Sequence, residues 1–278
     1  MTENSPPLAG VVGWPISHSK SPLLHGYWLK KYGISGHYVP IGLKPQDFET
    51  GIRALPKLGF AGVNLTIPYK EAMLAMADSI TDRASLIGAA NTVTFRGDGS
   101  IHADNTDSFG FIENVRSEAP DWVPSAGPAL VLGAGGASRS VVFALLNAGV
   151  PEVRVANRTR QRAEILREHF GAKIKVMDWN NFGEAVKDIN ILVNSTALGM
   201  VGKPKLQINL ANVPDTALVT DIVYTPLKTE LLLQAEERGL KTVDGLGMLL
   251  YQAVPGFESW FEVKPEVDQN LRNIVLGE

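Results

Sequence analysis

The sequence contains no cysteine, and this absence removes several kinds of chemistry at once. Without thiols the chain cannot form disulfides, use a thiolate nucleophile, or hold an iron–sulfur cluster or a cysteine-ligated zinc ion. Histidine is also scarce, and its 5 copies show no His-x-x-x-His spacing of the kind that binds zinc from one helix face. We therefore expect no metal centre.

Long hydrophobic runs and a strong charge of one sign are missing as well. No apolar stretch approaches the roughly 18 residues that cross a bilayer, and residues 1–7 lack the basic and apolar regions of a secretory signal. The formal net charge of −3 gives no field that would gather a polyanion. We expect a cytoplasmic protein, a monomer or homodimer, that binds neither nucleic acid nor membranes.

The 278 residues exceed the usual size of one hydrophobic core, so two domains are expected. In the first third, short β-rich runs alternate with helical stretches, which is typical of a mostly parallel sheet with crossover helices. The expected strands are 8–13, 38–41 and 62–67, the expected helices are 22–32 and 45–58, and an Asp-Gly turn predicts a hairpin of 91–96 with 101–103.

A second alternation of strands and helices begins after the Pro- and Ala-rich residues 120–128. About six strands separated by helices of ordinary length describe a doubly wound nucleotide-binding domain. Its expected strands are 128–132, 153–156, 188–193 and 217–221, its expected helices are 138–148 and 159–170, and the tail from 245 to 277 is expected to be helical. The fold class is therefore α/β, with two domains.

A glycine-rich turn lies between the expected strand 128–132 and the next helix, and it reads Gly133-Ala134-Gly135-Gly136-Ala137-Ser138. Glycines there let the backbone approach a diphosphate, whose charge then faces the helix N-terminus. Ser138 stands where the full dinucleotide fingerprint has its third glycine. On its own, the turn is also compatible with an ordinary strand-to-helix connection.

The next strand ends in Asn157-Arg158-Thr159, and Arg162 follows one helical turn later. An NAD-binding domain would place an acidic residue about there, roughly 20 residues past the glycines, and this sequence has none. Guanidinium groups suit a 2′-phosphate, and Asn157 and Thr159 can hydrogen-bond ribose and phosphate. We therefore expect NADP as cofactor, the alternative being that Arg158 and Arg162 form a solvated helix face.

Polar residues also follow two strands of the first domain, where an open parallel sheet binds ligands. They lie in the segments 15–22, which contains Ser19-Lys20-Ser21-Pro22, and 64–70, which reads Asn-Leu-Thr-Ile-Pro-Tyr-Lys. Such serines ordinarily cap helices, and that reading remains an alternative.

These segments, taken with Gly88-Ala89-Ala90-Asn91-Thr92, Asp104-Asn105-Thr106-Asp107, the glycine turn, Asn157-Arg158-Thr159 and the segment Asp244–Gln252, resemble shikimate dehydrogenases. The blocks occur in the family's order and cover residues 10 to about 260. The resemblance implies NADP-dependent, reversible reduction of 3-dehydroshikimate to shikimate, in aromatic amino-acid biosynthesis. It also implies a substrate-binding domain of residues 1–106 with 245–278 and a Rossmann-like NADP-binding domain of residues 107–244.

Individual roles follow from the same resemblance. Lys70 and Asp107 would form the catalytic pair, with Lys70 exchanging a proton at the C3 oxygen of the substrate and Asp107 orienting it. Substrate binding would fall to Ser19, Ser21, Asn64, Thr66, Asn91, Tyr224 and Gln252. Cofactor contacts would come from Gly133, Ala134, Gly135, Gly136, Ala137, Asn157, Arg158, Thr159, Arg162, Gly245 and Met248.

Three alternatives stay open. Lys70 and Asp107 could be a structural ion pair. A quinate/shikimate dehydrogenase would share the fold while accepting quinate or NAD. A non-catalytic sensor that binds shikimate or NADP would be expected to lack Lys70 or Asp107, and both are present.

Overall fold

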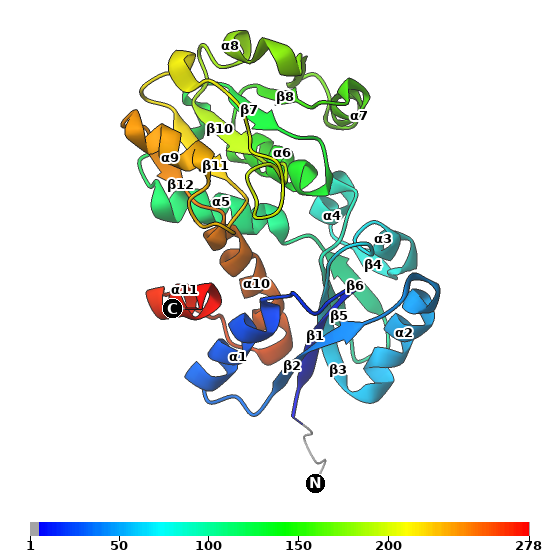
Figure 1. Cartoon of the computed structure of the whole chain (residues 1–278). Helices are drawn as coiled ribbons and strands as arrows, with labels where there is room; N and C mark the ends of the chain where they lie inside the picture. Colours follow the sequence, from blue (N-terminus) through cyan, green and yellow to red (C-terminus); the bar gives the residue numbers. More distant parts are fainter. Residues whose placement is uncertain (1–5, 278) are drawn as a thin grey trace. The chain divides into compact units, whose positions relative to one another are not determined.

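The computed structural model describes residues 6–277, which form two compact α/β units, each with a six-stranded sheet (Figure 1). Unit 1 comprises residues 6–106 and 250–277, and unit 2 comprises Asp107–Leu249. The boundary expected after residue 244 lies slightly earlier than the one observed, because helix α10 (Leu246–Phe261) begins in unit 2 and continues into unit 1.

The sheet of unit 1 is mixed, with strand order β2-β1-β3-β5-β6-β4. Strands β1, β2 and β3 are parallel, the expected hairpin β5-β6 is antiparallel, and β4 is parallel to β6. The strands are β1 (Leu8–Gly13), β2 (His37–Gly42), β3 (Phe60–Leu65), β4 (Ser79–Ile80), β5 (Thr92–Phe95) and β6 (Ile101–Asp104).

Two helical segments of unit 1 differ from expectation. Residues 45–58, expected as one helix, form a 3-10 turn (Pro45–Asp47), α2 (Phe48–Ala54) and a second 3-10 turn (Leu55–Leu58), because Pro56 cannot donate the N–H that the helix would need. The tail also breaks, after α10, near Glu262, which has φ 56°. The other helices are α1 (Ser21–Lys31), α3 (Ala72–Met76), α4 (Asp82–Ile87) and α11 (Gln269–Leu276).

The sheet of unit 2 is entirely parallel, with strand order β12-β11-β10-β7-β8-β9. This is the doubly wound order of dinucleotide-binding domains, in which the chain reverses direction across the sheet between β7 and β10. The strands are β7 (Ala129–Leu132), β8 (Val153–Ala156), β9 (Ile174–Met177), β10 (Ile191–Asn194), β11 (Leu218–Asp221) and β12 (Lys241–Val243).

Helices cover both faces of this sheet. Along β7, Ala129 and Val131 join one hydrophobic cluster with α5 and α6, while Leu130 and Leu132 join a second cluster with α8 and α9. A strand buried on both faces must be apolar throughout, which is why β7 reads as a continuous run. The helices are α5 (Asp107–Glu118), α6 (Gly136–Ala148), α7 (Arg160–Phe170), α8 (Phe182–Ala185) and α9 (Glu230–Glu237).

Trp260 of α10 packs directly over Gly62 of β3, and its indole N–H donates to the carbonyl oxygen of Val93 at 3.1 Å. A Cβ atom on Gly62 would lie 2.0 Å from Trp260 Nε1 and 2.2 Å from the Val93 oxygen. Glycine at this position therefore lets α10 pack closely against the sheet. No helix within residues 6–277 is both long enough and apolar enough to cross a membrane.

We expect Gly62→Ala to lower the free energy of unfolding by about 1 to 3 kcal/mol, because the added methyl group overpacks the indole. Gly26→Ala is the matched control, since a Cβ at Gly26 in α1 would meet nothing within 4 Å. Alanine there should stabilise the helix by about 0.5 to 1 kcal/mol. Urea unfolding of both variants tests this, and a Gly62→Ala protein as stable as wild type would contradict the packing argument.

Candidate functional site

The glycine turn at the end of β7 is fixed by hydrogen bonds among small side chains. Ser138 Oγ accepts the N–H of Gly135 at 3.0 Å and lies 2.8 Å from Ser195 Oγ, which in turn donates to the carbonyl oxygen of Leu132 at 2.7 Å. The serine in place of a third glycine thus joins the turn to the segment after β10. Both segments follow carboxyl ends of neighbouring strands.

The three glycines of the turn have different roles. Gly133 has φ +109°, and a Cβ there would lie 2.9 Å from Ser195 Oγ, so the backbone requires glycine. Gly135 and Gly136 have open space where a Cβ would be, with nothing within 4 Å. Gly135 is the N-cap of α6, so the open space beside it borders the backbone at the N-terminus of that helix. With Ala134 and Ala137 beside it, this opening fits the diphosphate of a dinucleotide.

At the end of β8, the structure keeps Arg158 and Arg162 exposed and without an ion-pair partner among the described residues. Neighbouring arginines differ, since Arg160 and Arg167 both bind Glu164, at 3.1 and 2.9 Å. Asn157 Nδ2 donates to the carbonyl oxygen of Thr159, the N-cap of α7, at 2.8 Å. Two exposed guanidinium groups therefore lie at a strand-to-helix turn that this hydrogen bond holds in place.

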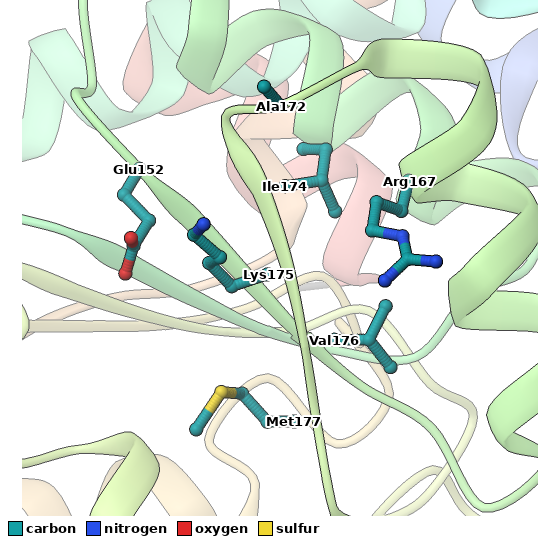
Figure 2. A pocket seen from close by; sticks show the side chains of 7 residues that line it. All are labelled: Glu152, Arg167, Ala172, Ile174, Lys175, Val176 and Met177. Carbon is teal, nitrogen blue, oxygen red and sulfur yellow. The ribbon is translucent and has the colours of Figure 1, made fainter.

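Figure 2 shows a pocket of unit 2 that is separate from these residues. It runs along the edge strand β9, and none of the expected cofactor residues lines it. Its lining consists of Glu152, Arg167, Ala172, Ile174, Lys175, Val176 and Met177. Within residues 6–277, no three histidine or carboxylate side chains are grouped so as to bind a metal ion.

In unit 1, the structure brings Asn64, Asn91 and Gln252 into one buried set of neutral hydrogen bonds. Asn91 Nδ2 donates to Gln252 Oε1 at 3.1 Å, and Asn64 Nδ2 donates to the carbonyl oxygen of Asn91 at 3.2 Å. Their side chains are 5%, 2% and 9% exposed, in that order along the chain. Residues 188 positions apart in sequence (252 − 64) thus share one amide network at the strand ends.

The remaining substrate residues expected in unit 1 lie in the turns around this network. Ser19 Oγ accepts the N–H of Ser21 at 3.3 Å, so Ser19 does stabilise the start of α1 while its own hydroxyl hydrogen stays available. Ser21 is buried at 8% exposure. Thr66 is half-buried, and its backbone N–H donates to the Val12 carbonyl oxygen at 3.0 Å.

The segment Asp104–Asp107 is anchored by charge as well as by neutral bonds. The Asp104 carboxylate accepts hydrogen bonds from Arg83 and Thr81, and the Asn105 side chain donates to the carbonyl oxygen of Ala89 at 2.9 Å. Burial alone would raise the pKa of Asp104, but the hydrogen bonds from Arg83 and Thr81 hold it below its ordinary value. This anchor fixes the chain immediately before Asp107.

Lys70 and Asp107 belong to different units. Lys70 is half-buried in unit 1, where its carbonyl oxygen accepts the N–H of Ala90 at 2.7 Å. Asp107 is the first residue of α5 and of unit 2, and it directly follows Thr106. Each backbone is therefore fixed within its own unit, and the catalytic roles of both residues remain predictions.

Tyr224, the substrate-binding residue expected from unit 2, lies in the loop after β11. Asp221 is 1% exposed and binds Asn194 at 3.0 Å, the N–H of Val223 at 2.9 Å and Thr229 at 2.7 Å, which holds both ends of the loop that carries Tyr224. Burial raises the pKa of Asp221 despite these bonds, and burial also raises the pKa of Tyr224.

Gly245 and Met248 follow the last strand of unit 2. A Cβ on Gly245 would lie 2.5 Å from the Ile222 carbonyl group, so only glycine allows this approach, and Met248 packs against the cluster that contains α5 and α6. Both residues are placed by close packing against their own unit.

Four residues of unit 1 that sequence analysis did not select take part in the amide network. Thr92 Oγ1 and Thr106 Oγ1 each lie 3.1 Å from Asn91 Oδ1, and Tyr38 donates to Asn64 Oδ1 at 2.7 Å, beneath the ring of His25. The threonines lie in segments already recognised as motifs. Tyr38 and His25 had no such signal, because only the strand pairing brings them to Asn64.

Comparison with known proteins gives one consistent result. Residues 11–93 match the shikimate dehydrogenase substrate binding domain, and residues 123–230 match the shikimate / quinate 5-dehydrogenase family. Shikimate dehydrogenase (NADP(+)) of Paracoccus denitrificans is 58% identical over 99% of this chain and 98% of its own. The enzyme of Dinoroseobacter shibae is also 58% identical, over 100% of both chains.

Solved structures agree over nearly the whole length. Shikimate 5-dehydrogenase of Thermus thermophilus, in complex with NADP(H) and shikimate, has a TM-score of 0.86 and 36% identity over 97% of this chain and 98% of its own. Quinate dehydrogenase of Corynebacterium glutamicum, in complex with NAD, has a TM-score of 0.91 and 29% identity over 98% and 99%. The fold therefore occurs in a shikimate and in a quinate dehydrogenase, solved with NADP(H) and with NAD.

The Arg83–Asp104 pair should stabilise unit 1 in a pH-dependent way. We expect Arg83→Met to cost about 1 to 3 kcal/mol near neutral pH, because it leaves a largely buried carboxylate without its cation. A lowered folded-state pKa contributes stability above the unfolded value of 3.8 and loses it as pH falls through the folded value. The cost of Arg83→Met should therefore shrink as pH falls below 3.8, as measured by urea unfolding.

Arg53→Met is the matched control, because Arg53 and Glu49 form an exposed pair at 3.2 Å. Such pairs contribute less than about 1 kcal/mol, so this variant should stay near wild type at both pH values. An Arg83→Met penalty that does not change with pH would show that the guanidinium acts through packing alone.

Proposed function

The chain belongs to the shikimate dehydrogenase family, and on that premise we propose that Lys70 and Asp107 carry out its reaction while the amide set of unit 1 selects the substrate. The reaction is the reversible, NADP-dependent reduction of 3-dehydroshikimate to shikimate, a step of aromatic biosynthesis. The chain is accordingly an oxidoreductase.

The observation that carries the substrate assignment is the buried set formed by Asn64, Asn91 and Gln252. A small ring that bears several hydroxyls needs neutral donors and acceptors in fixed directions, and amides provide both. Asn91 Nδ2 donates to Gln252 Oε1, and this hydrogen bond fixes the orientation of the Gln252 amide group. A ligand that left such buried groups unpaired would lose about 1 to 3 kcal/mol for each one, which supports selection among analogues.

The residues of unit 2 fit NADP. Gly135 and Gly136 leave space at the helix N-terminus for the diphosphate, and Ala134 and Ala137 keep the flanks of the turn small. Arg158 and Arg162, with Asn157 and Thr159, would hold the 2′-phosphate and its ribose. Gly133, Gly245 and Met248 would shape the site by close packing. When bound, NADP supplies or accepts the hydride at C4 of its nicotinamide.

The protein's own chemical work is binding, orientation and proton transfer. In the reductive direction Lys70 would give a proton to the C3 oxygen of the substrate and stabilise the charge that develops there; in the oxidative direction it would remove that proton. Asp107 would orient the Lys70 ammonium group and bind a neighbouring hydroxyl.

The carboxylate of the substrate would be bound by hydroxyl groups. Ser19 Oγ accepts a backbone N–H and so keeps its own hydrogen to donate, and Ser21 lies two residues further along the same turn. Thr66 would contact the ring, and Tyr224 would complete the site from its loop after β11. These groups offer directed hydrogen bonds without burying another full charge.

Quinate dehydrogenase activity is the second candidate, because the Corynebacterium glutamicum structure shares the fold. Arg158 and Arg162, which have no ion-pair partner within residues 6–277, favour NADP over NAD. Relatives at 57–59% identity are shikimate enzymes. Initial rates with each pairing of shikimate or quinate with NADP or NAD, read at about 340 nm, decide between the two. A folded protein that bound shikimate or NADP but turned over none of the four pairs would contradict both candidates and favour the ligand sensor.

We also propose that the protein works in the cytoplasm as a monomer or homodimer. The reaction needs the cellular NADP pool, and the net charge of −3 offers no field for a nucleic acid or an anionic membrane. Light scattering coupled to size-exclusion chromatography gives the oligomeric state directly.

Arg158→Ala should abolish most of a preference for NADP over NAD that we expect to be at least about tenfold, because the guanidinium forms a charge-assisted bond with the 2′-phosphate. Arg160→Ala is the matched control, since Arg160 is already bound to Glu164. The ratio of kcat/KM for the two cofactors is the measurement. An unchanged ratio in Arg158→Ala would assign that side chain to the solvated face of α7.

Lys70→Ala should lower kcat by at least about a hundredfold, because a positioned acid–base group typically contributes about 10² to 10⁴ in rate. KM for shikimate should change by less than about tenfold, since the loss falls mainly on the transition state. Lys57→Ala, an exposed lysine of the same unit, should keep the wild-type rate. If kcat of a folded Lys70→Ala protein fell less than about threefold, or if NADP affinity were lost instead, the lysine would be an ion-pair residue.

A further inference from the structure

We propose that Tyr38, held in a stack by His25, is a positioning residue that orients the Asn64 amide for reading a hydroxyl group of the substrate. This inference rests on the proposed function, because it gives Asn64 a place in substrate binding. It adds two residues, one from β2 and one from α1, that belong to none of the recognised motifs.

The sheet register brings Tyr38 to Asn64 across a strand. Tyr38 of β2 pairs with Ala9 of β1, and Asn64 of β3 pairs with Val11, so both side chains lie on the same face with β1 between them. Tyr38 is 8% exposed and Asn64 is 5% exposed. The Tyr38 hydroxyl donates to Asn64 Oδ1 at 2.7 Å, which is the shortest bond that the Asn64 side chain makes.

The Asn64 amide group has almost no hydrogen-bonding capacity left. Its two Nδ2 hydrogens have acceptors at 3.2 Å, the carbonyl oxygen of Asn91 and Thr92 Oγ1. Its Oδ1 has two lone pairs, and Tyr38 occupies one of them. What remains for a ligand is a single acceptor position in a fixed direction. A substrate hydroxyl at Asn64 must therefore donate, and Tyr38 sets where that acceptor points.

The donor character of Tyr38 is also fixed by its surroundings. Burial raises the pKa of Tyr38 well above its ordinary value, while a hydrogen bond from the Ser21 side chain opposes this more weakly. The phenol therefore keeps its proton at neutral pH. Ser21 is one of the groups proposed to bind the substrate carboxylate, so Tyr38 interacts with one proposed carboxylate group and one proposed ring group.

His25 provides the stack that holds the phenol ring. The two ring centroids lie 3.8 Å apart at an interplanar angle of 3°, and Trp28 and Phe257 enclose the imidazole at 5.7 and 5.8 Å. His25 is fully buried, and neither ring nitrogen makes a hydrogen bond of good geometry within the described chain. Burial lowers its pKa to about 3, with the Asn64 side chain opposing this more weakly, so the ring is neutral.

A double-mutant cycle separates positioning from mere packing. The full-length variants are Tyr38→Phe, Asn64→Ala and the double variant, assayed with shikimate and NADP. We expect Tyr38→Phe to raise KM for shikimate about three- to tenfold, with kcat and KM for NADP within about twofold of wild type. In the Asn64→Ala background the same substitution should change KM by less than about twofold, because the amide that it orients is gone.

Tyr27→Phe is the matched control. It removes a phenol hydroxyl from the same unit that also donates over 2.7 Å, but to Asp268 of α11. This variant should keep the wild-type KM.

His25→Phe should retain the stack and the wild-type KM, whereas His25→Ala should raise KM in the wild-type background only. The two His25 variants test the proposal if Tyr38→Phe folds poorly.

The outcomes distinguish this inference from the proposed function. Equal fold-changes of KM for Tyr38→Phe in both backgrounds, or no change in either, would overturn the positioning role while shikimate turnover stands. An Asn64→Ala enzyme with unchanged KM would remove Asn64 from the site and the inference with it. A wild-type protein without shikimate turnover would overturn the proposed function itself.

Discussion

The side-chain amide of Asn91 is the group on which the substrate half of the molecule depends. Its Oδ1 accepts the N–H of Thr106 at 2.7 Å, and its Nδ2 donates to Gln252 at 3.1 Å. At 2% exposure, an Asn91 amide without these partners would cost about 1 to 3 kcal/mol. One buried amide therefore holds together the start of β5, the residue before α5 and helix α10. The same amide is among the groups proposed to bind the substrate.

The two units offer different kinds of groups to a ligand. Unit 1 offers buried, neutral and directed groups, which suit a small polyol whose hydroxyls must be told apart. Unit 2 offers an open glycine turn at the N-terminus of α6 and exposed guanidinium groups at the start of α7, which suit a large anion. Ser138 and Ser195 act in unit 2 as Asn91 does in unit 1, because they fix the backbone so that its open side stays free.

Sequence reasoning succeeded where a local pattern is tied to one conformation. The apolar run at 129–132 forms β7, and the expected strand 153–156 forms β8, because each depends on residues near in sequence. The roles of the glycines and arginines that follow these strands stay predictions. Sequence reasoning erred where a proline interrupts a periodic pattern, as at Pro56, and it missed Tyr38 and His25. Nothing in residues 25–38 indicates an amide partner, since that contact arises only once β1 has paired with both β2 and β3.

The packing of Trp260 over Gly62 has a consequence for how the chain folds as it is made. The sheet of unit 1 begins at residue 8, yet its amide network and its indole contact require residues 252 and 260, near the end of the chain. Unit 2 is continuous from Asp107 to Leu249 and has its own hydrophobic clusters. During synthesis from the N-terminus, unit 2 can thus complete its hydrophobic core first. Unit 1 can complete its core only after the residues of α10 have been made.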